Sequence, residues 1–229
     1  MSPFFSGCAA LFEVYGEDGL KQLDINSYPL CLIGTYTLPG NGSLVTGPVT
    51  GLGVLVSFSA PDGVWFRPSY TRVGAGGALQ MRAISTADVT AYVFARTPNT
   101  LMTGAVFQIF DANGVLIFDG SRPPLNVIDY ARYTGPPGAQ IISKNHSAAQ
   151  SLNWSIAPVQ APEWGMYGAY MGNWDGRDWY EYYSASCAWR KNGSSVELAV
   201  TSVFEEAEHN LPEGGSNNHQ YMLVKIPAY

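Results

Sequence analysis

The densest group of residues that could contact a ligand lies between Trp164 and Trp189. These 26 residues hold nine of the chain's 30 aromatic side chains. Aromatic faces stack on the C–H faces of sugar rings, carboxylates and guanidinium groups bind the hydroxyls, and protein interfaces share the enrichment in Trp, Tyr and Arg. The candidate contacts to a protein interface or a glycan are Trp174, Asp175, Arg177, Asp178, Trp179 and Tyr180.

The same rings could instead fill a hydrophobic core. Strands favour aromatic residues, and Tyr180–Tyr183 reads as a strand. Trp residues ten positions apart could mark successive strands of a meander; they are Trp154, Trp164 and Trp174, then Trp179 and Trp189. Core packing, a protein interface and a glycan site therefore stay open for this segment.

Residues with catalytic spacing are few. The histidines, His146, His209 and His219, belong to no spaced metal-binding pattern, and the Gly-x-Ser-x-Gly turn of the α/β-hydrolases does not occur. Residues 205–209, EEAEH, could bind a divalent cation or transfer protons. We expect them instead to form a solvated loop, because the sequence continues as a polar loop through residues 210–220. We expect no catalytic residues, no metal site and no cofactor.

The composition limits the partners and the fold. The 229 residues are 46% hydrophobic and 13% charged, which is typical of a globular chain. A formal net charge of −6 offers no broad basic surface for phosphates, so nucleic acid is not an expected partner. The 25 glycines and 15 prolines leave little room for long helices, which favours an all-β fold.

The sequence also contains no clear export or membrane-insertion signal and no paired cysteine pattern. No cationic segment precedes the apolar N-terminal residues, and no apolar run reaches about 18 residues, so neither an export signal nor membrane insertion is expected. Three cysteines, Cys8, Cys31 and Cys187, lie far apart and read as buried thiols.

An internal repeat organises the sequence. Residues 11–33 align without gaps on residues 106–128, 95 positions later, with six identical pairs. Asp18-Gly19 and Asn113-Gly114 fall in the middle of the two copies, and both dipeptides suit the positive φ angles of a tight hairpin turn. Each copy is therefore predicted to be a β-hairpin, followed by a third strand that begins after Pro29 or Pro124.

The repeat predicts two tandem β-sandwich modules, jelly-roll-like and related by duplication. The first covers residues 1–98, and the second covers residues 104–229 with an aromatic-rich insertion at about 160–190. Strands are expected at Val54–Ser59, Val89–Phe94 and Val196–Phe204, and the alternation in the third directs Val196, Leu198 and Val200 inward. The alternative is one sandwich that carries two similar hairpins.

The repeated motif resembles a known family. FEVYGEDG and FQIFDANG are similar to the opening hairpin of small virion proteins of tailed bacteriophages, found near the tail tip of Pseudomonas-type siphophages and their relatives. Val64–Pro68 and Ala91–Phe94 resemble two later strands of the same proteins. The likeness covers most of the first half of the chain and the start of the second, while residues 139–220 depart from it.

The resemblance implies a non-enzymatic structural protein of the tail tip or baseplate. Its partners would be other virion tail proteins or a second copy of the chain, and a glycan or receptor on the host surface is a further candidate partner. The protein would reside in the host cytoplasm during assembly and in the virion tail afterwards. Two alternatives remain: a carbohydrate-binding receptor-recognition protein and a polysaccharide-degrading enzyme.

Overall fold

The computed structural model describes most of the chain. The described residues are 13–15, 21–24, 29–49, 53–73, 77–96, 107–110, 114–134, 141–159, 165–174, 177–208 and 218–227. They form seventeen β-strands and one short 3₁₀ helix, which confirms the all-β prediction.

The strands follow the alternation of apolar and polar residues in the sequence. Their bounds are β1 Glu13–Tyr15, β2 Lys21–Asp24, β3 Leu30–Leu38, β4 Ser43–Pro48, β5 Val54–Ser59, β6 Trp65–Val73, β7 Ala78–Ser85, β8 Val89–Arg96, β9 Gln108–Phe110, β10 Leu116–Asp119, β11 Val127–Thr134, β12 Ile141–Asn145, β13 Trp154–Pro158, β14 Gly165–Trp174, β15 Arg177–Asn192, β16 Ser195–Glu208 and β17 Asn218–Lys225, and the helix η1 is Ser147–Ala149. Three of these strands, β5, β8 and β16, contain the segments predicted as strands from the sequence.

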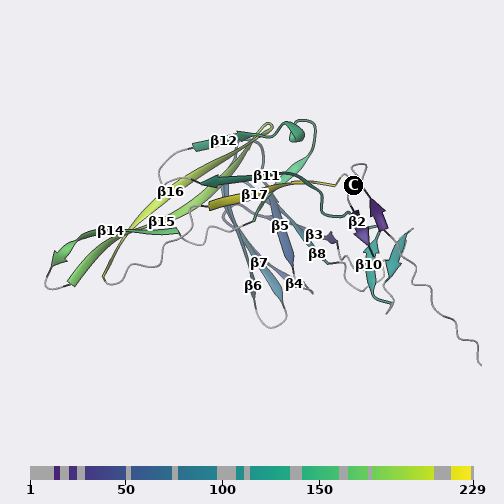
Figure 1. The fold of residues 1–229 in the computed structure, drawn as a ribbon, viewed down its shortest axis with the longest axis horizontal. Helices are drawn as coiled ribbons and strands as arrows, with labels where there is room; N and C mark the ends of the chain where they lie inside the picture. Colours follow the sequence, from purple (N-terminus) through teal and green to yellow (C-terminus); the bar gives the residue numbers. More distant parts are fainter. Residues whose placement is uncertain are drawn as a thin grey trace, which may run out of the picture. The chain divides into compact units, whose positions relative to one another are not determined.

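Two large sheets form a β-sandwich (Figure 1). Sheet I has the order β11-β17-β13-β5-β8-β3, and sheet II has the order β12-β16-β15-β6-β7-β4, with β14 paired to β15. Trp189 of sheet II meets Tyr221 of sheet I edge to face, with ring centroids 5.0 Å apart. Phe58 of sheet I and Tyr70 of sheet II lie 6.4 Å apart, so the inner faces of the two sheets pack on each other.

The core follows from the period of two along each strand. In β7, Leu79, Met81 and Ala83 are fully buried, and the residues between them are exposed. Trp154 and Trp189 are each only 1% exposed, which confirms core packing for these two aromatic residues. Burying one large apolar side chain contributes about 1.5–3 kcal/mol, so the interior of the sandwich holds the sheets together.

Both halves of the chain contribute strands to each sheet. In sheet I, β5 pairs with β13 at Phe58 and Ile156, and in sheet II, β6 pairs with β15 at Phe66 and Trp189. The chain divides into two compact units. One consists of residues 1–33, 50–54 and 94–125, and the other of residues 34–49, 55–93 and 126–229. These units do not coincide with the predicted modules 1–98 and 104–229, because the sandwich is assembled from distant strands.

Both copies of the repeated segment are hairpins, as predicted. The pairs are Glu13 with Asp24, Val14 with Leu23 and Tyr15 with Lys21 in β1–β2, and Gln108 with Asp119, Ile109 with Phe118 and Phe110 with Leu116 in β9–β10. Every pair in the second hairpin lies 95 positions after its counterpart in the first. Each register also skips one residue of the second strand, Gln22 or Ile117, so the two hairpins share the position of a bulge.

The segments that follow the hairpins pair with each other. Cys31 forms an antiparallel bridge with Pro124, and the amide of Leu125 donates to the carbonyl of Leu30 at 2.7 Å. Leu30 and Leu125 occupy equivalent positions of the repeat. The two copies therefore meet in one compact unit, whereas the sequence had placed them in separate modules.

An aspartate shared by the two copies ties the second hairpin to the turn after it. The Asp119 carboxylate is fully buried and accepts bonds from the backbone amide of Ser121 at 2.9 Å and from its hydroxyl at 2.6 Å. Burial alone would raise the pKa of this carboxyl, but the bonds from Ser121, then Gln108, and the charge of Arg122 keep it below its ordinary value. Asp119 therefore stays ionised and holds the Ser121 turn closed.

The turn of the second hairpin gives a first prediction. Gly114 has φ = 77°, while Asn113 beside it, and Asp18 and Gly19 in the turn of the first hairpin, lie outside the described residues. A Cβ atom at Gly114 would meet no neighbour within 4 Å, so only the backbone penalty of positive φ opposes a side chain. Gly114→Ala should destabilise the hairpin by about 1 kcal/mol, measured as faster amide hydrogen exchange in β9 and β10.

Gly47→Ala is the matched control for this variant. A Cβ atom there also meets nothing within 4 Å, and Gly47 is not among the positive-φ glycines. Equal exchange rates in the Gly114 variant and the wild type would contradict the assigned turn.

Candidate binding surfaces

The predicted aromatic site lies on a long hairpin of β14 and β15. Its register pairs Trp174 with Arg177, Asn173 with Asp178 and Gly172 with Trp179. The backbone thus brings Trp174, Arg177, Asp178 and Trp179 to one end of the hairpin, and Tyr180 follows opposite Tyr170. Asp175 lies outside the described residues, and the side chains of the other five lie outside the described part of the structure. Whether they contact a partner stays a prediction.

The acidic segment after this hairpin is a strand, and the predicted loop was wrong there. Strand β16 continues to Glu208, with Glu205 opposite Tyr182 and Glu208 opposite Trp179. The long strand β15 supplies backbone partners, which outweighs the polar composition of the segment. Strand β17 likewise begins at Asn218, inside the stretch expected to be a loop, and His209 lies outside the described residues.

A buried histidine joins the two sheets at one open side of the sandwich. His146 follows β12 of sheet II and is 1% exposed. Its Nδ1 lies 2.6 Å from a carboxylate oxygen of Asp129, on β11 of sheet I. Its Nε2 lies 2.8 Å from the hydroxyl of Tyr221, on β17 of sheet I. The imidazole therefore bridges the edge strands β11 and β12 through side chains.

The charges of this trio favour a structural role. The bond from His146 is the main reason that the pKa of Asp129 lies below its ordinary value. Burial, and then the negative charge of Asp129, raise the pKa of the Tyr221 hydroxyl above its ordinary value. A tyrosine that acts as a nucleophile needs the opposite shift. The trio therefore works as a hydrogen-bonded link between the sheets.

Local sequence patterns could not have found this link. Asp129 lies 17 residues before His146, and Tyr221 lies 75 residues after it. The three residues meet only because β11 pairs with β17 while β12 belongs to the other sheet. The only indication in the sequence was His146 itself, a single histidine in a polar segment, and such a histidine does not by itself indicate a binding partner.

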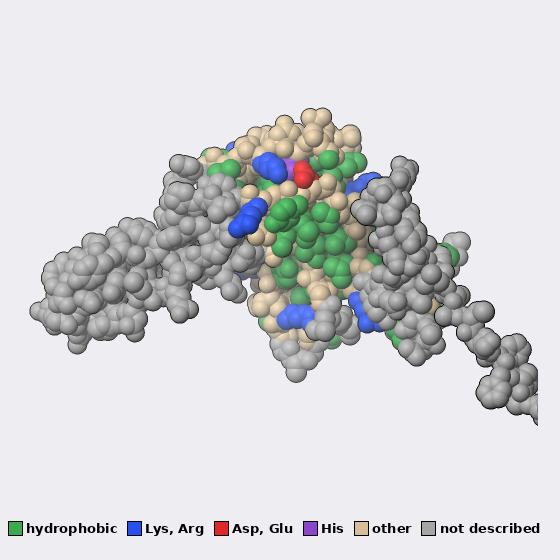
Figure 2. Space-filling model, viewed as in Figure 1, with side chains coloured by type: hydrophobic (Ala, Val, Ile, Leu, Met, Phe, Trp, Pro, Cys, Tyr) green, Lys and Arg blue, Asp and Glu red, His purple; other side chains and the backbone are tan. Residues whose placement is uncertain are grey.

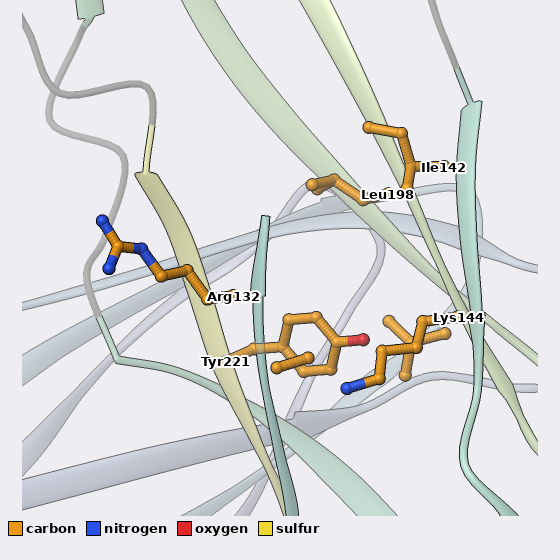
Figure 3. Close-up of a pocket in the computed structure, with 7 residues that line it drawn as sticks. Arg132, Ile142, Lys144, Leu198 and Tyr221 are labelled. Carbon is orange, nitrogen blue, oxygen red and sulfur yellow. The ribbon is translucent and has the colours of Figure 1, made fainter. Parts of the chain in front are cut away.

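Next to the link, a small slot opens between the edge strands β11 and β12. Its volume is about 80 Å³. Most of the lining is apolar and comes from Ala131, Ile142, Val196 and Leu198. Tyr221, Arg132 and Lys144 complete the lining. In Figure 3 the Tyr221 hydroxyl points toward Lys144, while the guanidinium of Arg132 points away from both. The Lys144 ammonium donates to the backbone oxygen of Tyr130 at 3.3 Å and so spans the two edge strands. A slot of this size holds two or three water molecules or one small aliphatic group.

A larger groove crosses the outer face of sheet II. It has a volume of about 550 Å³. The strand registers place Ala199 opposite both Ile141 and Ala188, and Arg67 opposite Ile84, so these residues follow one another across five strands. The alanines form a low floor, while the flanking Ile84 and Ile141 are 43% and 62% exposed. A hollow with apolar walls and a guanidinium in its lining results.

A second row of residues beside the groove is held by ionic and aromatic contacts. The Arg190 guanidinium lies over the Trp65 ring, 4.4 Å from its centroid, and pairs with the Glu197 carboxylate. Asn192 donates to the other Glu197 oxygen at 2.7 Å. The bonds from Asn192, then Arg190, hold the pKa of Glu197 below its ordinary value. Arg190 therefore fixes the ring of Trp65, which also lines the groove.

Other candidate chemistry is limited in the part of the chain that the structure describes. No group of three or more His, Cys, Asp or Glu side chains there could hold a metal ion. Cys31 and Cys187 are buried thiols, as predicted, while Cys8 lies outside the described residues. Burial raises the pKa of Cys187 to about 12. No helix within the described ranges is long and apolar enough to cross a membrane.

Comparisons with known proteins add no relative. No protein-family model, no curated protein and no solved structure matches the chain.

The buried link gives a second prediction. His146→Ala should lower the free energy of unfolding at pH 7 by about 2 kcal/mol, because it leaves the Tyr221 hydroxyl buried without its partner. Urea denaturation measures this change. Tyr221→Phe removes the hydroxyl together with its hydrogen bond, so it should lower the free energy of unfolding by less than His146→Ala does. An unchanged stability in His146→Ala would contradict the link.

The Asp129–His146 contact should also depend on pH. Because the folded-state pKa of Asp129 is lowered, its contribution is present above the ordinary aspartate pKa of about 3.9 and is lost as the pH falls through the lower folded value. The coupling energy in a double-mutant cycle of Asp129→Asn and His146→Ala should be favourable at pH 6, begin to fall near pH 4 and vanish only below the lowered folded pKa of Asp129. A coupling that stays constant over this range would contradict the assignment.

Proposed function

We propose that this protein is a structural component of a phage tail tip or baseplate that acts through protein–protein contacts. The repeated hairpin motif supports the proposal through its resemblance to small tail-tip virion proteins. The all-β sandwich is a fold compatible with a building block of this kind, although the fold alone does not specify a function.

Exposed aromatic side chains on the second hairpin carry the proposal. Phe107 and Phe110 are 51% and 43% exposed, and the Phe107 ring lies 6.2 Å from that of Phe118. Large apolar side chains that gather at a surface mark sites that a partner covers. Figure 2 shows a further area of hydrophobic side chains on one face of the sandwich. A protein that is embedded in an assembly would use such surfaces.

The partners in this proposal are neighbouring tail proteins or further copies of the chain. Assembly takes place in the host cytoplasm, and the finished protein resides in the virion tail. Contact with the host surface is compatible with this position and is not required by it.

Immunogold electron microscopy of the virions tests the location. Virions of the phage whose genome encodes the chain are expected to carry gold label at one end of the tail. If the protein occurs only free in the lysate and never in purified particles, the proposal fails.

Variants of the hairpin test the surface. The double variant Phe107→Ser and Phe110→Ser should fold and remain soluble, yet reach virions in at least tenfold lower amount than the wild type. Val45→Ser is the control, because Val45 is 57% exposed but lies on β4 of the sandwich. Normal incorporation of the double variant would assign the contact to another surface.

Carbohydrate recognition is the second candidate, favoured by the register that collects Trp174, Arg177, Asp178 and Trp179 at one hairpin end. Folded Trp174→Ala and Trp179→Ala variants should then lose binding to host-surface glycans on an array. If both variants bind glycans as well as the wild type does, the hairpin is not the glycan-binding site. Only scattered carboxylates favour a polysaccharide-degrading activity. If the protein releases no reducing ends from host polysaccharide, this activity is excluded.

A further inference from the structure

The strands at the ends of the two sheet orders differ in how their free backbone groups are used. Sheet I ends at β11 and β3, and sheet II ends at β12 and β4. An edge strand presents N–H and C=O groups that can pair with another chain, unless a proline, a bulge or a local contact blocks them. The contacts along each edge therefore indicate where another chain can add a strand.

Contacts within the chain block the other three edges at one or more positions. On β11, the amide of Tyr130 donates to a carboxylate oxygen of Asp129 at 2.7 Å, and its carbonyl accepts a bond from the Lys144 ammonium at 3.3 Å. On β4, the register shifts before Pro48, and this proline has no amide hydrogen to donate. The segment after the second hairpin bonds to the first residues of β3.

Strand β12 presents its outward backbone groups in a regular row. The amide of His146, just after β12, donates to the carbonyl of Ser194, just before β16, at 3.0 Å. Bonded positions alternate along an antiparallel pair, so the residues between the bonded ones, Ile141, Ser143 and Asn145, direct their N–H and C=O groups away from β16. Within the described ranges, no hydrogen bond from another segment reaches these three backbone positions.

The side chains of β12 leave this row accessible. Ile141 is 62% exposed, and Ser143 and Asn145 are exposed as well. A lysine on an edge strand commonly opposes pairing, but the Lys144 ammonium is bonded to the carbonyl of Tyr130 on β11. In Figure 3 the Lys144 side chain extends from its strand toward Tyr221. The lysine is thus held against the other sheet.

A second β12 fits this edge well. If two copies pair antiparallel about a two-fold axis at Ser143, this serine faces its own counterpart, and Ile141 faces Asn145 of the second copy. All three outward residues then form pairs that exchange two backbone hydrogen bonds each, whereas a register shifted by two residues keeps only two such pairs. Ile142 faces Lys144 of the second copy, so the two lysines do not oppose each other. A two-fold contact needs only this one self-complementary surface.

We propose that β12 pairs with β12 of a second copy, antiparallel and centred on Ser143, so that sheet II continues from one copy into the other. This contact is distinct from the exposed aromatic residues of β9 and from the hairpin end around Trp174. It assigns a surface and a register to the contact between copies, and it does not rest on the proposed location in a virion.

Sedimentation equilibrium of the full chain tests the association. The wild type is expected to approach the mass of two chains as its concentration rises. Ser143→Lys sets two like charges opposite each other and should weaken the association at least tenfold. Val45→Lys is the matched control, because Val45 is 57% exposed on β4 at the other end of the same sheet order, and it should change the association less than threefold. A wild type that stays monomeric up to about 0.5 mM, or equal effects of the two variants, would overturn the proposal.

A charge pair tests the register. Ser143→Lys and Ser143→Glu should each associate weakly alone, whereas their equimolar mixture should associate at least tenfold more strongly, because position 143 faces position 143. Ser143 is exposed and its amide is not bonded to β16, so both variants are expected to fold. A mixture that associates no better than the separate variants would contradict the pairing at Ser143.

Amide hydrogen exchange identifies the strand that forms the contact. As the concentration rises, exchange at Ile141, Ser143 and Asn145 should slow at least tenfold, while the amide of His146, which is already bonded, should change little. Slower exchange along β4 or β11 with no change along β12 would overturn the proposal. None of these outcomes affects the immunogold test of virion location, so the two proposals fail separately.

Discussion

Pairing between strands that are distant in the chain is the constraint on which the sandwich depends. Phe58 lies opposite Ile156 in one sheet, and Phe66 lies opposite Trp189 in the other. Each pair joins the first half of the chain to the second and sets a large apolar side chain in the core, since all four residues are almost fully buried. Without these pairs each sheet would divide into one group of strands from the first half of the chain and another from the second. The outer-face groove also exists only because β6 and β15 are neighbours.

Local chemistry explains which parts of this fold were predictable. The Asp-Gly and Asn-Gly turns specify hairpins over a few residues, and both hairpins have the expected position and a common register. Alternation in Val196 and Leu198 likewise predicted inward side chains, which are buried. The order of the strands was not predictable, because antiparallel partners far apart in sequence leave no local signature. The similarity of the hairpins predicted two modules, and no local pattern could predict that strands from both halves of the chain share each sheet.

The same limit applies to the candidate sites. The aromatic segment was visible from its density, and its backbone forms a hairpin, but density does not say where side chains point. The groove on sheet II depends on residues of β6, β7, β12, β15 and β16 that no sequence window contains together. Its floor consists of alanines, which carry no chemical signal of their own. Only the strand register turns them into a hollow beside Arg67.

The position of β17 has a consequence for how the protein forms. This strand, near the C-terminal end of the sequence, lies between β11 and β13 inside sheet I. During synthesis, β11 and β13 therefore emerge well before the strand that both must pair with, and their backbone groups and apolar faces remain uncovered in the interval. Folding with such a large share of non-local pairs is slow, and exposed strand edges invite association with other chains. The architecture thus makes the growing chain vulnerable to aggregation until β17 is complete.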